Sequence, residues 1–77
     1  MSTFERLYKD TDFEAEAYNY VMNGITDRAE IRTDIAECLR ENLKDHDIYE
    51  LPADFDELVD EYTNRVYGNI VNPNTKL

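Results

Sequence analysis

At four places in this 77-residue chain where a helix could begin, a Ser, Thr or Asp stands three residues before a Glu, and apolar residues at helical spacing follow. This is the spacing of a capping box, in which the two side chains satisfy backbone N–H groups at the start of a helix. The pairs are Ser2 with Glu5, Thr11 with Glu14, Asp27 with Glu30, and Asp54 with Glu57. No two-residue alternation of apolar and polar residues is long enough to argue for a strand. Residues 1–77 are therefore predicted to form a single all-α domain, a small three- to four-helix bundle.

The apolar positions indicate which face each long helix is expected to bury. After Asp27, a helix running to about Lys44 carries Ile31, Ile35, Cys38, Leu39 and Leu43 on one side. After Asp54, a helix reaching up to Pro73 carries Phe55, Leu58, Val59, Tyr62, Val66 and Ile70. Cys38 is predicted to act as a small buried hydrophobe. Gly68 either ends the last helix a turn early or weakens it by about 1 kcal/mol relative to Ala.

The first third of the chain leaves two interpretations open. An unbroken helix would carry an apolar face made of Phe4, Leu7, Tyr8, Ala15, Tyr18 and Met22. The capping box at Thr11 would instead restart the helix. In either case Asn23-Gly24 is predicted to end the segment, because Gly tolerates the left-handed conformation that helix ends favour.

Other apolar and aromatic residues are expected either to complete the core or to contact a partner. Residues 46–53 contain a proline and no helical period, so they are predicted to form a loop. The residues expected to plug the core edge from this loop are Ile48, Tyr49 and Leu51. Tyr8, Tyr18 and Tyr62 lie on apolar faces and are expected in the core. Tyr20, Tyr49 and Tyr67 lie at the margin of those faces, where they either widen the core or contact an Arg-rich surface.

Negative charge is the second dominant feature, with 18 Asp and Glu against 8 Lys and Arg and a net charge of −10. One predicted helix face carries Asp27, Glu30, Asp34, Glu37 and Glu41, in a band about 80° wide opposite the apolar side. These carboxylates repeat roughly every 5 Å along the axis, comparable with the roughly 3.4 Å phosphate spacing of one DNA strand. A second run, uninterrupted by Lys or Arg, consists of Asp45, Asp47, Glu50, Asp54, Asp56, Glu57, Asp60 and Glu61. The segment from Asp10 to Asp27 also lacks cations.

Three interpretations of this charge are open. Acidic residues in first helical turns improve caps and complement the helix dipole, and acidic faces keep a domain soluble. Adaptation to high salt is a further alternative. However, a net charge of this size opposes compactness through self-repulsion, and solubility needs only about 2–8 net charges on a small domain. The excess favours a functional acidic binding face.

No set of side chains typical of catalysis or metal binding occurs in the sequence. Acidic segments starting at Asp10 and Asp45 begin like calcium loops, but Ala15 and Glu50 occupy the sixth position, where the sharp turn requires Gly. His46 is the only histidine, and no glycine-rich phosphate loop is present. The chain is therefore expected not to be an enzyme and to hold no metal or cofactor.

The single cysteine and the absence of a long apolar segment predict a cytoplasmic protein. Nucleic acid backbones and anionic lipids repel an anionic surface, so direct binding to nucleic acid or to a membrane is not expected. A partner should instead be basic. Because so small a core supplies little stability, a homodimer is also possible.

In size, predicted helical content and one-sign carboxylate bands such as Asp27 to Glu41, the chain resembles small acidic bacteriophage proteins that inhibit host enzymes. These are the anti-restriction and anti-CRISPR inhibitors, some of which mimic DNA. The resemblance implies a protein that occupies the basic groove of a nucleic-acid-binding host protein in the host cytoplasm. The alternative is a helical adaptor or regulatory protein that docks through an apolar and tyrosine-bearing face, with its charge serving solubility.

Overall fold

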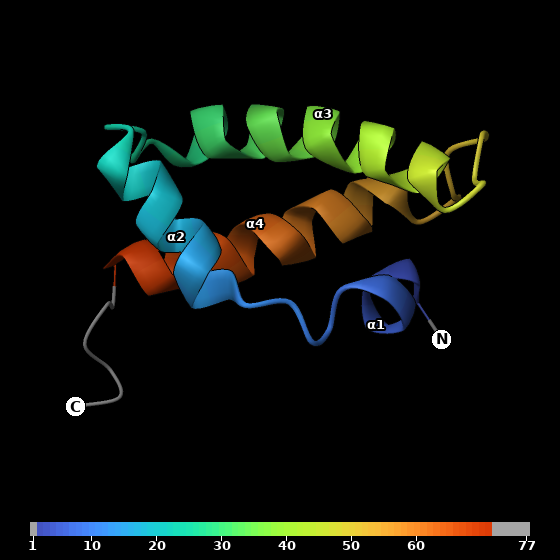
Figure 1. The fold of residues 1–77 in the computed structure, drawn as a ribbon, viewed down its shortest axis with the longest axis horizontal. Coiled ribbons are helices and arrows are strands. Elements are labelled where there is room, and N and C mark those ends of the chain that lie inside the picture. Colours follow the sequence, from blue (N-terminus) through green and yellow to red (C-terminus); the bar gives the residue numbers. More distant parts are fainter. Residues whose placement is uncertain (1, 72–77) are drawn as a thin grey trace.

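The computed structural model describes residues 2–71, which fold into four helices (Figure 1). The helices are α1 (Thr3–Leu7), α2 (Phe13–Met22), α3 (Arg28–Asp45) and α4 (Phe55–Val71). The predicted all-α bundle is confirmed, and no strand occurs in the described part of the chain. Pro73, where the sequence predicts the last helix to stop, lies outside the described residues.

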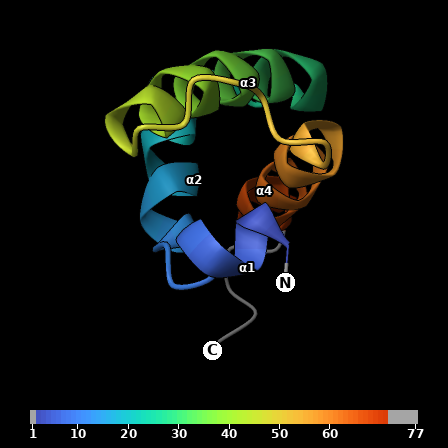
Figure 2. The ribbon, with the colours of Figure 1, turned by 90° about the vertical axis from the view of Figure 1, so that its right-hand side faces the viewer.

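Helix α4 organises the bundle, because each of the other three helices packs against it. α3 and α4 run antiparallel along the long axis of the molecule, while α2 lies across one end of α4 and α1 near the other (Figure 1). Viewed end-on, the four helices surround a common centre (Figure 2). The expected core residues are buried there: Ile31, Ile35, Leu39, Leu58, Val59 and Tyr62.

Aromatic contacts fix the N-terminal third of the chain to α4. Phe4 of α1 stacks on Phe13 of α2, with ring centroids 5.9 Å apart. Tyr62 of α4 makes edge-on contacts with Tyr8 and with Phe13, at centroid distances of 5.5 and 5.0 Å. These edge-to-face pairs each contribute roughly 0.5–1.5 kcal/mol beyond the apolar area that they bury. The short helix α1 therefore keeps its place through tertiary contacts.

The first segment is broken, and the helix restarts one residue later than the Thr11 capping box predicts. Asp12 is the N-cap of α2, and its Oδ1 accepts a hydrogen bond of 3.1 Å from the backbone N–H of Ala15. Starting at Phe13, α2 buries Phe13 and Ala17 and packs Tyr20 partly against the core. The expected face of Ala15, Tyr18 and Met22 is wrong, because these three residues are exposed. Tyr18 lies five positions after Phe13, roughly 140° around the helix.

The predicted ends of the other helices are largely confirmed. Ser2 and Asp27 accept hydrogen bonds from the backbone N–H groups of Glu5 and Glu30, at 3.2 and 3.1 Å. Gly24 follows α2 with a φ of +74°, a conformation that favours glycine. The α4 helix continues past Gly68 without a break.

Asp54 precedes α4 as predicted, but its side chain makes a tertiary contact. Its Oδ2 accepts a hydrogen bond of 3.0 Å from the backbone N–H of Thr3, and its Oδ1 accepts one of 2.8 Å from the Thr3 hydroxyl. The two residues are 51 positions apart, so this bidentate contact joins α1 to the start of α4. The hydrogen bonds from Thr3 lower the pKa of the Asp54 carboxyl group.

The contact between Asp54 and Thr3 is expected to be lost on acidification. A carboxyl group whose pKa is lower in the folded state stabilises the fold above its unfolded pKa, and this contribution disappears as the pH falls through the folded pKa. The Thr3 amide resonance followed by NMR should therefore titrate with a midpoint below the ordinary Asp value. An Asp54→Asn variant should remove the titration. A midpoint at or above the ordinary value would contradict the contact.

Three further expectations about burial are wrong. Cys38 is exposed, because α3 buries Ile31, Ile35, Leu39 and Leu43 in steps of four and leaves position 38 at the edge of that face. Residues 46–54 connect α3 and α4, but only Ile48 of the expected core plug packs against the core. Tyr49 and Leu51 are 76% and 53% exposed.

Thr63 is a buried polar residue of α4, and its hydroxyl has no hydrogen-bond partner among the described residues. An unsatisfied buried hydroxyl costs roughly 1–3 kcal/mol, and valine has nearly the same shape. Thr63→Val is therefore expected to raise the free energy of unfolding by about 1 kcal/mol, measured by urea denaturation. Thr33→Val is the matched control, because Thr33 is exposed and its hydroxyl donates to the Ala29 carbonyl oxygen at 3.1 Å. Equal effects of the two substitutions would refute the expectation.

Candidate functional site

The outer face of α3 carries the predicted acidic band, and the structure leaves the whole band exposed. Asp27, Glu30, Asp34, Glu37 and Glu41 are all exposed, while the opposite side of the helix is buried. Ala29 and Thr33 lie beside the carboxylates, and these small residues line a shallow hollow together with Glu30, Asp34 and Glu37. We call the five carboxylates the α3 acidic face.

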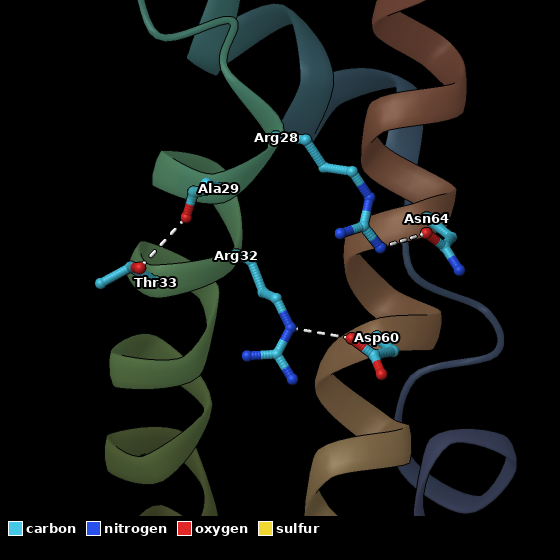
Figure 3. Close-up of polar contacts among 6 residues, drawn as sticks. All are labelled: Arg28, Ala29, Arg32, Thr33, Asp60 and Asn64. Carbon is cyan, nitrogen blue, oxygen red and sulfur yellow. Dashed lines mark hydrogen bonds and ion pairs between the residues drawn. The ribbon is translucent and has the colours of Figure 1, made fainter.

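Three of the four cations of α3 point away from this face, which the sequence alone does not show. Arg28 donates to Asn64 Oδ1 at 2.6 Å, and Arg32 pairs with Asp60 at 2.8 Å, so both guanidinium groups face α4 (Figure 3). The guanidinium carbon of Arg40 lies 5.5 Å from the centre of the Phe55 ring. Only Lys44 contacts the acidic face, with its Nζ 3.7 Å from Glu41. Within residues 2–71, no ion pair compensates the other four carboxylates of the face.

The second acidic run, from Asp45 to Glu61, does not form one continuous band. Asp54 is bound to Thr3, Asp60 pairs with Arg32, and Glu61 lies 3.6 Å from Arg65 on the next turn of α4. The remaining members are exposed but divided between the end of α3, the loop and the first turn of α4: Asp45, Asp47, Glu50, Asp56 and Glu57. The run itself contains no Lys or Arg, but in the fold Arg32 of α3 and Arg65 of α4 pair with two of its carboxylates.

The three marginal tyrosines have different surroundings. Tyr49 is exposed in the loop, with its hydroxyl 3.4 Å from Asp47. Tyr67 is partly buried against the core. Tyr20 is also partly buried, and its hydroxyl donates to Asp34 Oδ2 at 2.6 Å. Burial and the Asp34 carboxylate raise the pKa of the Tyr20 hydroxyl, so it stays protonated and holds Asp34 in place.

Two features of the surface are missed by the sequence patterns. Glu16 of α2 accepts a hydrogen bond of 2.6 Å from the Tyr62 hydroxyl and lines a groove between α2 and α3 that Asp34 also lines. Tyr18, Val21 and Met22 form an exposed apolar patch on α2, beside a groove that Ile70 also lines. The absence of Lys and Arg from Asp10 to Asp27 is the sequence signal that Glu16 has no cation nearby in the chain. The apolar patch cannot be predicted without knowing the residue at which α2 restarts.

Comparisons with known proteins add no relative to this description. No protein-family model matches the chain, and neither the curated proteins nor the solved structures contain a significant match.

In the part of the chain that the structure describes, no helix is long and apolar enough to cross a membrane. The candidate site consists of exposed carboxylates on the outer face of α3.

Self-repulsion among these carboxylates predicts that salt stabilises the fold. Raising NaCl from about 20 mM to about 0.5 M shortens the screening length from roughly 20 Å to roughly 4 Å and should increase the melting temperature by several degrees. The neutralising variant Glu37→Gln, in the middle of α3, should raise the melting temperature at low salt and reduce the salt increment. Circular dichroism measures both effects. A melting temperature that falls steadily with added NaCl would contradict this expectation.

Proposed function

We propose that this protein is a non-enzymatic inhibitor that binds the basic nucleic-acid-binding surface of a partner protein. The α3 acidic face occupies that surface in place of nucleic acid phosphates. One observation carries the proposal: three of the four cations of α3 face α4, while the carboxylates remain exposed on the opposite side. A face that served solubility alone would not require this separation of the two signs of charge.

The geometry supports competition by both charge and shape. The carboxylates lie on a single helix whose buried side is anchored against α4, so little conformational entropy is lost when they meet a partner. Arginine and lysine side chains of a basic groove form charge-assisted hydrogen bonds with such carboxylates. Long-range attraction between opposite charges also accelerates the encounter. The bulk of the bundle then blocks access by nucleic acid.

Capture followed by competition tests this function. The tagged protein is used to retrieve partners from a bacterial lysate treated with nuclease, which removes bridging DNA. The purified partner is then assayed for nucleic acid binding with and without this protein, at low and at near-physiological salt. We expect displacement of nucleic acid and an affinity that falls steeply as the salt concentration rises. A partner whose nucleic acid binding is unaffected would overturn the proposal.

A second candidate function is supported by the apolar patch on α2. Tyr18, Val21 and Met22 are 64%, 47% and 66% exposed and lie next to one another on α2. A helical adaptor or regulatory protein would dock through this patch, and its affinity would hardly respond to salt. Under this alternative, Val21→Ser would weaken partner binding while Glu30→Lys would not.

A further inference from the structure

A groove between α2 and α3 combines an apolar floor with two carboxylates. The groove measures about 330 Å³, and its floor contains Ile35, Leu39 and Tyr62, which are at most 7% exposed. Glu16 lines it from α2 and Asp34 from α3. Both α2 and α3 pack against α4, and Tyr62 of α4 forms part of the floor between them.

The two carboxylates are held in place by tyrosine hydroxyls from different helices. Tyr20 donates to Asp34 Oδ2 and Tyr62 donates to Glu16 Oε1, both at 2.6 Å. Burial, followed by the adjacent carboxylate, raises the pKa of each tyrosine, so both hydroxyls remain donors. Each carboxylate retains a second oxygen. No ion pair to Glu16 or Asp34 occurs among residues 2–71.

Both negative charges act on the same small region of the groove. The thiol of Cys38, which also lines the groove, has its pKa raised by the partial burial of its sulfur and then by Asp34, Glu16 and Glu37. A cation entering here would meet two carboxylates at once. Its stem would lie on apolar and aromatic surface, which suits an amphipathic side chain.

We infer that this groove binds an arginine side chain of the basic partner, paired with Asp34 and Glu16. The inference rests on the proposed function and specifies which contact anchors the partner. A guanidinium group is weakly hydrated and planar, so it can stack on Tyr20 or Tyr62 while it donates to two acceptors. A lysine ammonium is compact and strongly hydrated, and it would lose more hydration on this floor. The contact therefore discriminates between the two cations.

Hexa-arginine and hexa-lysine peptides test this inference by isothermal titration calorimetry at near-physiological salt. We expect wild-type protein to bind hexa-arginine several-fold more tightly. Glu16→Gln and Asp34→Asn each remove one charge while keeping an oxygen for the tyrosine hydroxyl. Each should weaken hexa-arginine binding roughly three- to tenfold and reduce the preference for arginine. Asp10→Asn, at an exposed turn position outside the groove, is the matched control and should change affinity less than about twofold.

Modification of Cys38 provides an independent measurement in the otherwise unchanged protein. N-ethylmaleimide would place a bulky group at the groove and is expected to abolish the arginine preference. A Cys38→Ser variant given the same treatment should keep it. Circular dichroism of each sample confirms that the fold is retained.

The outcomes separate this inference from the proposed function. Equal binding of the two peptides by wild-type protein, or groove variants that behave like Asp10→Asn, would overturn the arginine site. If Glu30→Lys and Glu37→Lys nevertheless weaken both peptides, the α3 acidic face keeps its proposed role. Failure of the wild-type protein to bind either peptide would overturn both proposals.

Discussion

Leu58→Ala is expected to unfold most of the protein. Leu58 is 1% exposed and lies on α4, the helix against which the other three helices pack. Truncating a buried leucine costs roughly 2–5 kcal/mol, through lost transfer free energy and through the cavity that remains. A single core in a domain this small supplies only about 3–5 kcal/mol of stability. The variant should therefore lose most of its helical circular dichroism signal at a temperature where the wild-type protein is folded.

Leu51→Ala is the matched control for this substitution. Leu51 is 53% exposed in the loop before α4, so the same loss of side chain removes little buried surface. Surface substitutions of this kind change stability by about 0.5 kcal/mol or less. If urea denaturation shows similar losses for both variants, either Leu51 belongs to the core or Leu58 does not. Either result would overturn the packing described above.

Local sequence patterns predict the helices well because capping and periodicity act over three or four residues. The Asp27 cap and the burial of Ile31, Ile35 and Leu39 follow directly from such spacings. The predicted burial of side chains is wrong where it depends on the exact residue at which a helix starts. Tyr18 was expected in the core, and the restart at Phe13 places it on the solvent side of α2.

Those features of the candidate site that depend on a single helix could be predicted from the sequence, whereas contacts between helices could not. The α3 acidic face is a property of α3 alone, and its exposure follows from the buried side opposite. The partners of Asp54 and Asp60 lie 51 and 28 positions away in sequence, on other helices, so no local pattern indicates them. The orientation of Arg28 and Arg32 toward α4 is a tertiary feature for the same reason, as is the pairing of Glu16 with Tyr62.

Charge reversal on the α3 acidic face is expected to abolish most partner binding. Glu30→Lys and Glu37→Lys each replace a favourable contact with a like-charge contact, which can cost several kcal/mol where the pair is desolvated. Both residues are exposed, so neither reversal should unfold the protein. Asp34→Lys should also weaken binding, but it removes the acceptor of the Tyr20 hydroxyl as well, so its effect on folding is measured separately. Affinity for the purified partner is measured at two salt concentrations.

Reversals in the second acidic run identify which surface the partner uses. Glu50→Lys and Asp56→Lys alter exposed carboxylates of the loop and of the first turn of α4, away from the α3 acidic face. If they reduce affinity more than Glu30→Lys, the interface lies at that end of the bundle and α3 carries only a solvated face. If reversals in both regions leave affinity unchanged, nucleic acid mimicry fails. The exposed patch of Tyr18, Val21 and Met22 then becomes the expected docking surface, and a salt-independent affinity lost in Val21→Ser would establish it.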